Sequence, residues 1–345
     1  MKRAIPLAAA LLILPLSACG GGSGGSSDKA AESKGPIKIW YANNPEEITW
    51  AKQMVESWNS SHKDEKITAQ EIPAGKSSEE VIGAAITAGN APCLVFNTAP
   101  AAVSQFQKQG GLVPLDDFPG AKEHIEKRSG GLAEQYASED GKYYQLPWKS
   151  NPVMISYNKK AFAKAGIDTD NPPLKTHKQF LATSEKLVDK GGVKAAIWPA
   201  PSSEFFQPFF DFYPLFAAES GGKQLMEDGK AQFAGPEGQR VADFWRSMYD
   251  KKLSQKEKYN GDAFADGKAA MTIAGPWAVK VYGEKIDYGV APVPTSKGES
   301  AAETKTFSDA KSVGMFNSCK NRGTAWEVMK FASSEKQDRK LLETT

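Results

Sequence analysis

The segment 37–110 alternates between short extended runs and amphipathic runs, and this alternation constrains the fold more than any other feature of the sequence. Ala51, Val55 and Trp58 recur at helical spacing, so the run after the first strand predicts a helix that buries one face. Consecutive strand–helix units form a parallel sheet that is covered by helices on both faces. We therefore predict an α/β fold that begins with three parallel strands, which are Ile37–Tyr41, Ile67–Ile72 and Cys93–Asn97.

The N-terminus has the pattern of an export signal. Residues 1–3 are basic and residues 4–16 are apolar, and a run of this length is too short for a membrane-spanning helix. The residues from Leu16 to Gly20 resemble the bacterial lipobox, in which a peptidase cuts before a cysteine that carries lipid. We predict a signal peptide over 1–18, lipidation of Cys19 at the outer face of the cell membrane, and a flexible Gly- and Ser-rich linker over 19–36. The alternative is an ordinary secretory signal with an incidental cysteine.

Residue counts exclude several classes of function. Lys and Arg number 43 against 41 Asp and Glu, so the sequence has no evident basic footprint for nucleic acid. Three widely spaced histidines argue against a zinc centre, and we expect neither a metal nor a cofactor. Cys93 and Cys319 remain besides Cys19, and in an exported protein such a pair favours a disulfide over a metal site. Eight Trp and 17 Phe residues suit a site that stacks flat apolar faces.

Four stretches in the second part of the sequence resemble one known family. They are Gly267–Trp277 (GKAAMTIAGPW), Asp287–Pro294 (DYGVAPVP), Val153–Lys164 and the weaker Ala217-x-x-x-Gly221-Gly222. In this order and spacing they are similar to the family 1 extracellular solute-binding proteins, the maltose-binding-protein-like receptors of ABC sugar importers. The match to the family signature departs from the pattern in its first half, where Trp148 and Lys149 replace the usual residues.

The resemblance implies a two-lobe periplasmic-binding-protein-like fold of type II, with the ligand in a cleft between two α/β lobes that are joined by crossing strands. It places the first lobe at 37–147 and 294–345 and the second lobe at 148–293. Family members continue through a third crossover, so we expect the C-terminal part of the family fold to be missing from this sequence. In the family's sheet the third strand lies beside the strand that returns from the second lobe, which implies a disulfide between Cys93 and Cys319.

The first candidate ligand contacts follow from a general rule. Open α/β sheets bind ligands beyond the carboxyl ends of their strands. This rule selects Asn43 and Asn44 after the first strand, and Asn97 and Thr98 after the third. Helix capping is the competing explanation for Asn44. The resemblance adds Trp277, which stands where the family has a tryptophan that stacks on a sugar ring.

Further candidates divide between ligand contact and core packing. Trp148, Trp198 and Tyr213 fit either role, whereas most of the aromatic segment Phe205–Phe212 is expected to pack the core. Two charged residues complete the set. These are Lys149, where the lobes cross, and Asp309, just before the strand expected at Ser312.

The resemblance implies a monomeric receptor that captures a sugar, an oligosaccharide rather than a monosaccharide, and delivers it to the permease subunits of an ABC importer without catalysis. A phosphorylated solute such as glycerol phosphate is the alternative, with Lys149 or Lys311 as counter-charge, although the sequence has no Gly-rich phosphate loop. A secreted glycoside hydrolase would need two carboxylates that flank the bond. Adjacent pairs such as Glu46-Glu47 better suit helix caps and solvated faces, and a surface adhesion protein would show repeats that the sequence lacks.

Overall fold

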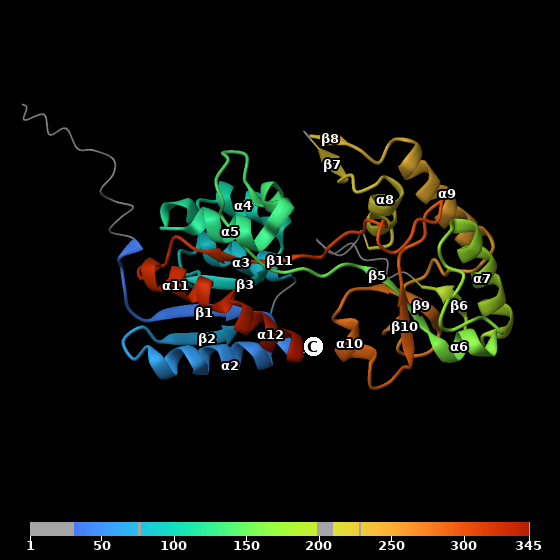
Figure 1. Ribbon diagram of the computed structural model, residues 1–345, viewed down its shortest axis with the longest axis horizontal. Coiled ribbons are helices and arrows are strands. Elements are labelled where there is room, and N and C mark those ends of the chain that lie inside the picture. Colours follow the sequence, from blue (N-terminus) through green and yellow to red (C-terminus); the bar gives the residue numbers. More distant parts are fainter. Residues whose placement is uncertain (1–30, 75–76, 199–209, 228, 345) are drawn as a thin grey trace, which may run out of the picture.

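The computed structural model describes residues 31–74, 77–198, 210–227 and 229–344. The expected signal peptide, Cys19 and residues 205–209 of the aromatic segment lie outside the described residues. The described residues form two α/β lobes, each built on its own sheet (Figure 1). No helix among them is long and apolar enough to cross a membrane.

The first sheet has five strands in the order β2-β1-β3-β11-β4. Strand β1 (Ile37–Tyr41) pairs in parallel with β2 (Ile67–Glu71) and with β3 (Leu94–Thr98), which confirms the predicted parallel start of the fold. Strand β11 (Lys311–Met315) runs antiparallel between β3 and β4 (Leu146–Lys149). The chain therefore leaves this lobe after β4 and returns to it in β11.

Helices cover both faces of this sheet, as the alternation of side chains along β3 requires. Phe96 belongs to one buried cluster and its neighbour Val95 to the other, because successive strand residues point to opposite faces. Ser77 caps the helix over residues 78–87 by accepting a hydrogen bond from the Glu80 backbone N–H. The helices are α2 (Pro45–Ser61), α3 (Ser78–Thr87), α4 (Val103–Lys108), α5 (Ala121–Ser129), α11 (Arg322–Ala332) and α12 (Glu335–Thr344).

The second sheet has the order β10-β5-β9-β6. A capping box between Thr176 and Gln179 begins a helix that packs beside this sheet, over residues 177–190. Phe162, Phe180 and Phe216 lie in the buried cluster of this lobe. The strands are β5 (Met154–Asn158), β6 (Ala195–Ile197), β9 (Ala269–Ala274) and β10 (Tyr288–Ala291), with a short ribbon of β7 (Met226–Glu227) and β8 (Lys230–Ala231). The helices are α6 (Lys159–Lys164), α7 (His177–Lys190), α8 (Tyr213–Glu219), α9 (Pro236–Asp250) and α10 (Ala278–Tyr282).

Two crossing segments join the lobes, one between β4 and β5 and one before β11 (Figure 1). They pair with each other through a bridge between Pro152 and Ser308. Trp148 and Lys149 lie in β4, so the first sheet extends past the expected boundary at 147. Thr295 hydrogen-bonds with Lys175 and His177 of the second lobe, so that lobe extends past the expected boundary at 293.

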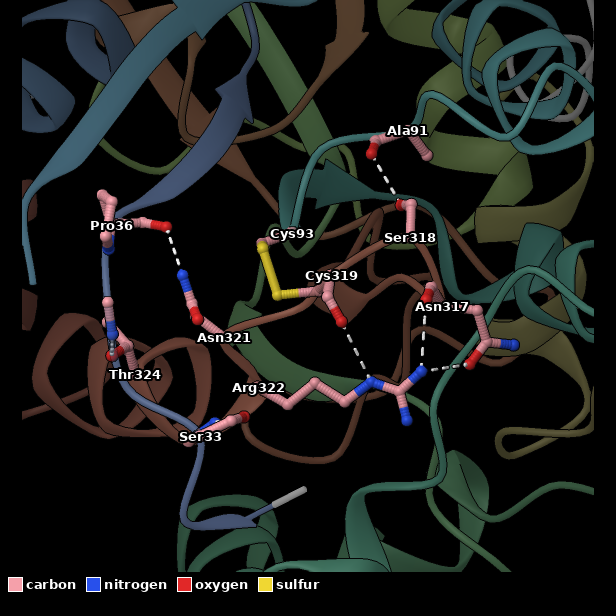
Figure 2. The surroundings of a disulfide bond; sticks show 12 residues. Ser33, Pro36, Ala91, Cys93, Asn317, Ser318, Cys319, Asn321, Arg322 and Thr324 are labelled. Atoms are coloured by element: carbon pink, nitrogen blue, oxygen red, sulfur yellow. Dashed lines mark hydrogen bonds between the residues drawn. A yellow bond between two sulfur atoms is a disulfide. The ribbon is translucent and has the colours of Figure 1, made fainter. Parts of the chain in front are cut away.

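Cys93 and Cys319 are joined by a disulfide across the first lobe, as the resemblance implies (Figure 2). Cys93 directly precedes β3, and Cys319 lies between β11 and α11. The two cysteines are 226 residues apart in sequence, and the whole second lobe lies between them. The disulfide therefore links the two chain segments that build the first lobe.

Candidate ligand-binding site

Asn97, near the end of β3, combines an unusual backbone with an unpartnered side chain. Its φ of 66° lies in the left-handed region, and its Oδ1 is buried with no hydrogen-bond partner among the described residues. The pairing of β3 with β11 shifts register between Ser312 and Gly314, so Asn97 lies in a bulge. Bulges and strained residues are concentrated next to functional sites, where they re-aim a side chain.

A buried ion pair lies beside this bulge, at the same end of the sheet. The Glu47 side chain is 0% exposed and pairs with Lys149, which is 16% exposed. Asn44 donates its side-chain N–H to Glu47 at 2.9 Å, and the ammonium of Lys149 lies 5.2 Å from the centre of the Trp148 ring. Burial raises the pKa of the Glu47 carboxyl, and the Lys149 charge offsets only part of that rise.

Glu46 and Glu47 lie in the first turn of α2, as expected for a helix start, but the expectation of a solvated face is wrong, because both residues are buried. Asn43, the other candidate after β1, is exposed, and the described structure shows no side-chain hydrogen bond for it. Asn44 occupies the N-cap position of α2, yet its side chain makes no capping hydrogen bond and instead holds Glu47. The competing capping explanation for Asn44 therefore fails.

A second charged pair lies on the crossing segment that enters β11. Lys311 bonds Asp309 at 2.8 Å, and the Asn151 side chain donates to the Asp309 backbone carbonyl at 3.0 Å. Burial raises the pKa of Glu79, at the start of α3, and the nearby Lys311 charge lowers it in part. Polar and charged groups near the ends of four strands thus lie together at one end of the first sheet. We call this set the polar edge, and it consists of Asn44, Glu47, Asn97, Lys149, Asp309 and Lys311.

Aromatic rings form a continuous run against the same crossing segment. Phe210 stacks on Trp277 with ring centres 5.9 Å apart and lies 6.0 Å from the ring of Phe307, which in turn stacks on Tyr213 at 4.7 Å. All four side chains are partly exposed. We call these four residues the aromatic run. Gly275 is required for it, because a Cβ at that position would lie within 3 Å of the Trp277 ring.

The remaining candidates are placed elsewhere. Trp148 is 4% exposed and packs between Trp50 and Phe96, so it is a core residue and not a stacking platform. Thr98 is also buried, and its hydroxyl donates to the Val95 carbonyl. Within the described part of the chain, no group of three or more His, Cys, Asp or Glu side chains is arranged to hold a metal ion.

Trp198, after β6, makes its own set of contacts. Its indole N–H donates to the Glu257 carbonyl at 2.8 Å, and its ring meets Tyr259 edge-on at 5.1 Å. No recorded ring contact joins it to Trp277 or Phe210 in the described structure. Trp198 is therefore not part of the aromatic run.

Sequence reasoning missed Glu47, Phe210 and Phe307 as members of the site. Glu47 is in the first turn of a helix, where a carboxylate ordinarily interacts with the helix dipole, so its sequence context pointed to the surface. Phe307 is an isolated aromatic residue, and the sequence signal that could have identified it was its position on a segment that crosses between the lobes. Phe210 lies in the segment Phe205–Phe212, most of which was expected to pack the core, and the sequence did not single it out.

Two α/β lobes that are joined by paired crossing segments, with polar and aromatic side chains gathered at the crossing, define the class of two-lobed ligand-binding proteins. The sequence profile of the bacterial extracellular solute-binding proteins matches residues 41–339. The chain belongs to this family, and the resemblance noted in the sequence is confirmed.

Relatives with known names are similar over most of the chain. A maltotriose-binding protein of Pyrococcus abyssi is 24% identical over 313 residues, which cover 88% of this chain and 64% of that protein. The maltodextrin-binding protein MdxE of Bacillus subtilis is 27% identical over 305 residues, which cover 84% and 66%. A solved structure of an uncharacterized Listeria monocytogenes protein matches with a TM-score of 0.72 at 27% identity, and the match covers 90% of this chain and 80% of that one. The chain thus spans about two thirds of the length of the two named relatives.

Proposed function

We propose that this chain is the sugar-binding component of an ABC importer, held at the outer face of the membrane by lipid on Cys19. The observation that carries the proposal is the meeting of two chemically different surfaces on one segment. Phe307 belongs to the aromatic run and Asp309, two residues later, belongs to the polar edge. A sugar presents apolar ring faces and a rim of hydroxyls, so it needs both surfaces at once.

An oligosaccharide is the class of sugar that this arrangement favours. The aromatic run joins four rings in sequence, whereas one ring is enough to stack on a single pyranose. The names of the two relatives, which refer to maltotriose and maltodextrin, point to the same class of ligand. The unpartnered Asn97 Oδ1 supports hydroxyl recognition, because a buried acceptor without a donor is costly until a ligand supplies one.

The competing candidates have less support. A phosphorylated solute would need free cations, but Lys149 and Lys311 are each engaged by a carboxylate. A glycoside hydrolase would need two carboxylates that face the scissile glycosidic bond. Glu47 and Asp309 instead form ion pairs with Lys149 and Lys311. We propose that the protein captures its ligand without chemistry, as a monomer that closes around the ligand and presents it to the permease.

A thermal-shift screen with maltotriose, other oligosaccharides and glycerol phosphate tests the ligand class. A ligand at a hundred times its Kd stabilises a protein by about 2.7 kcal/mol, which is a shift that the screen resolves. We expect an oligosaccharide to raise the Tm and glycerol phosphate to have no effect. The reverse pattern would establish the phosphorylated-solute alternative, and release of shorter sugars on incubation would establish an enzyme.

Variants of the aromatic run test the site itself. Gly275→Ala displaces the Trp277 ring while keeping the tryptophan, and Trp277→Ala removes it. We expect both variants to bind the sugar about 2- to 12-fold more weakly by calorimetry, because stacking of a ring contributes about 0.5–1.5 kcal/mol beyond the area it buries. Phe233→Ala is the matched control, since Phe233 is an exposed aromatic residue of the second lobe outside the run. Equal affinity in all three variants would move the site away from Trp277.

The lipid anchor is tested by mass spectrometry of protein extracted from membranes of the producing cells. The proposal expects a mature chain that starts at Cys19 and carries the mass of lipid on that residue. A mature chain that starts elsewhere, with an unmodified Cys19 or none, would establish the ordinary secretory signal instead.

A further inference from the structure

Residues 31–36, directly before β1, contact the first lobe, although they belong to the segment expected to be a flexible linker. The Ser33 carbonyl accepts from the Thr324 backbone, and the Gly35 backbone donates to the Thr324 hydroxyl at 3.1 Å. Figure 2 shows the Asn321 side chain reaching the Pro36 carbonyl, at 2.8 Å, close to the disulfide. The linker therefore leaves the fold at a defined point, at the start of α11.

The fit at this point is close enough to depend on a glycine. A Cβ at Gly323 would lie within 3 Å of the backbone oxygens of Ala31 and Ser33. Glu65 adds an ion pair to Lys34 at 3.7 Å and accepts a hydrogen bond from the Thr324 hydroxyl. The anchored part of the linker thus runs to about residue 31, which shortens the free leash.

Cations surround the exit point. Lys38 and Lys320 are exposed and line a surface hollow of about 400 Å³ together with Pro36 and Trp40. Lys66, which is also exposed, precedes β2 and accepts a backbone hydrogen bond from Ile37. Neither Lys38, Lys66 nor Lys320 has a recorded ion pair in the described structure. We call Lys34, Lys38, Lys63, Lys66, Lys320 and Arg322 the basic edge.

The carboxylates nearby are fewer and partly engaged. Glu32, Asp64 and Glu65 lie on the same chain segments as the basic edge, so cations exceed carboxylates by six to three. Glu65 is already bound by Lys34 and Thr324. The guanidinium of Arg322 donates to oxygens of Asn317 and Cys319 and not to a carboxylate. The edge therefore keeps a net positive charge.

We propose that the basic edge rests against the anionic phospholipid headgroups of the membrane to which the chain is anchored. The inference rests on the proposed lipid at Cys19, because a short leash from that lipid holds this edge within reach of the bilayer. Lysines near an anionic surface are attracted to it within roughly one Debye length, about 8 Å at physiological salt. A lipid gives attachment, and the basic edge adds orientation.

The proposed orientation has a consequence for ligand capture. The basic edge lies at the amino ends of β1 and β2, whereas Asn44 and Asn97 lie at the carboxyl ends of β1 and β3. A five-residue strand is about 17 Å long. The bilayer would therefore meet the end of the sheet opposite the polar edge, and the polar edge would stay open to arriving solute.

Lysine acetylation of the lipidated protein on vesicles tests the orientation. Vesicles of 30 mol% phosphatidylglycerol in phosphatidylcholine are compared with pure phosphatidylcholine vesicles, and acetylation is read by peptide mass spectrometry. We expect Lys38 and Lys320 to react about 5-fold more slowly on the anionic vesicles and to recover at 1 M salt. Lys178 and Lys186, exposed on α7, are the control lysines and should react alike on both. Equal rates for Lys38 and Lys320 on both vesicles would overturn the proposal.

An unlipidated form separates the surface from the anchor. In Cys19→Ala protein, Lys38→Gln with Lys320→Gln should weaken partition onto anionic vesicles about 20-fold, from roughly 5-fold for each cation, and the α7 double variant Lys178→Gln with Lys186→Gln should not. No difference between these pairs would overturn the basic edge while leaving the anchor intact. Lipidated wild-type protein that fails to float with neutral vesicles would instead refute the anchor.

Discussion

The ion pair between Glu47 and Lys149 allows the strongest quantitative prediction, because Glu47 is fully buried, Lys149 is only partly exposed and each is the other's main charged partner. Glu47 is 0% exposed, and once Lys149 is replaced by Met its carboxylate keeps only the Asn44 amide as a donor. Removing one partner of a buried pair leaves an uncompensated charge and costs about 3–5 kcal/mol. We therefore expect Lys149→Met to lower the free energy of unfolding by about 4 kcal/mol.

The reverse change should cost less. In Glu47→Gln the Lys149 ammonium remains 16% exposed and lies over the Trp148 ring, so water and the ring partly replace the lost carboxylate. We expect a loss of about 2 kcal/mol. The double variant removes both charges and should lie within about 1 kcal/mol of wild type, since burial alone already raises the pKa of Glu47 and so opposes its ionised form.

Urea unfolding at pH 7.5, followed by tryptophan fluorescence, measures all four proteins of this cycle. Trp50 and Trp148 pack against each other at a tilt beside the pair, so their fluorescence reports on this core. The coupling energy should be about 5–7 kcal/mol in the stabilising sense. The Lys149→Met deficit should also shrink as the pH is lowered, because burial raises the pKa of Glu47 and protonation removes the buried charge. Strictly additive single variants, or a Lys149→Met protein as stable as wild type, would refute the reasoning.

Three further predictions concern other parts of the molecule. Alkylation and peptide mass spectrometry of unreduced protein should find no free thiol at Cys93 or Cys319, and replacing both by Ala should cost up to about 5 kcal/mol by the chain-entropy model for so long a loop; two alkylated cysteines would contradict the bond. Asn97→Gly should raise the free energy of unfolding by about 1 kcal/mol, because it relieves a left-handed backbone and removes an unpartnered oxygen, while it weakens sugar binding; a less stable variant would show that the oxygen has a donor. Burial lowers the pKa of His177, so the unfolded chain takes up its proton first and the stability from this group is lost as pH falls below about 6.5. The Tm difference between pH 7.5 and 5.5 should therefore shrink in His177→Gln but keep the part due to His124, whose pKa is also lowered by burial, and an unchanged difference would refute this assignment.

The local patterns of the first lobe were sufficient to predict its parallel strands but not its last strand. The first lobe was expected to end at residue 147, whereas β4 occupies Leu146–Lys149 and includes Pro147. Proline has no backbone N–H for a ladder, so it argues against a central strand. β4 is the edge strand of the sheet, and there the missing donor needs no partner. Which strand lies at the edge of the sheet depends on how β11 pairs after the chain returns from the second lobe. The local sequence around β4 contains no signal for its pairing with β11.

The candidate site divides in the same way between local and distant causes. The strand-end rule located Asn44 and Asn97, because the end of a strand is a property of the local sequence. It could not identify Glu47, whose burial depends on Lys149 more than a hundred residues later. Trp148 was ambiguous for a related reason, since a tryptophan on an edge strand faces the core or the ligand according to which helices pack there, and here Trp50 of α2 covers it.

The crossing segment from Thr306 to Asp309 links the two surfaces that we propose to contact one ligand. Phe307 stacks on Tyr213 of the second lobe, while Asp309 bonds Lys311 at the start of β11 in the first. The same segment is held to the other crossing segment by hydrogen bonds from Thr306 to the Val153 carbonyl and between Ser150 and Ser308. Residues 306–309 belong to neither hydrophobic core, so a rotation at the crossing would not require either core to repack. Such a rotation moves the aromatic run relative to the polar edge, and a ligand that touches both surfaces therefore stabilises one angle between the lobes over the others.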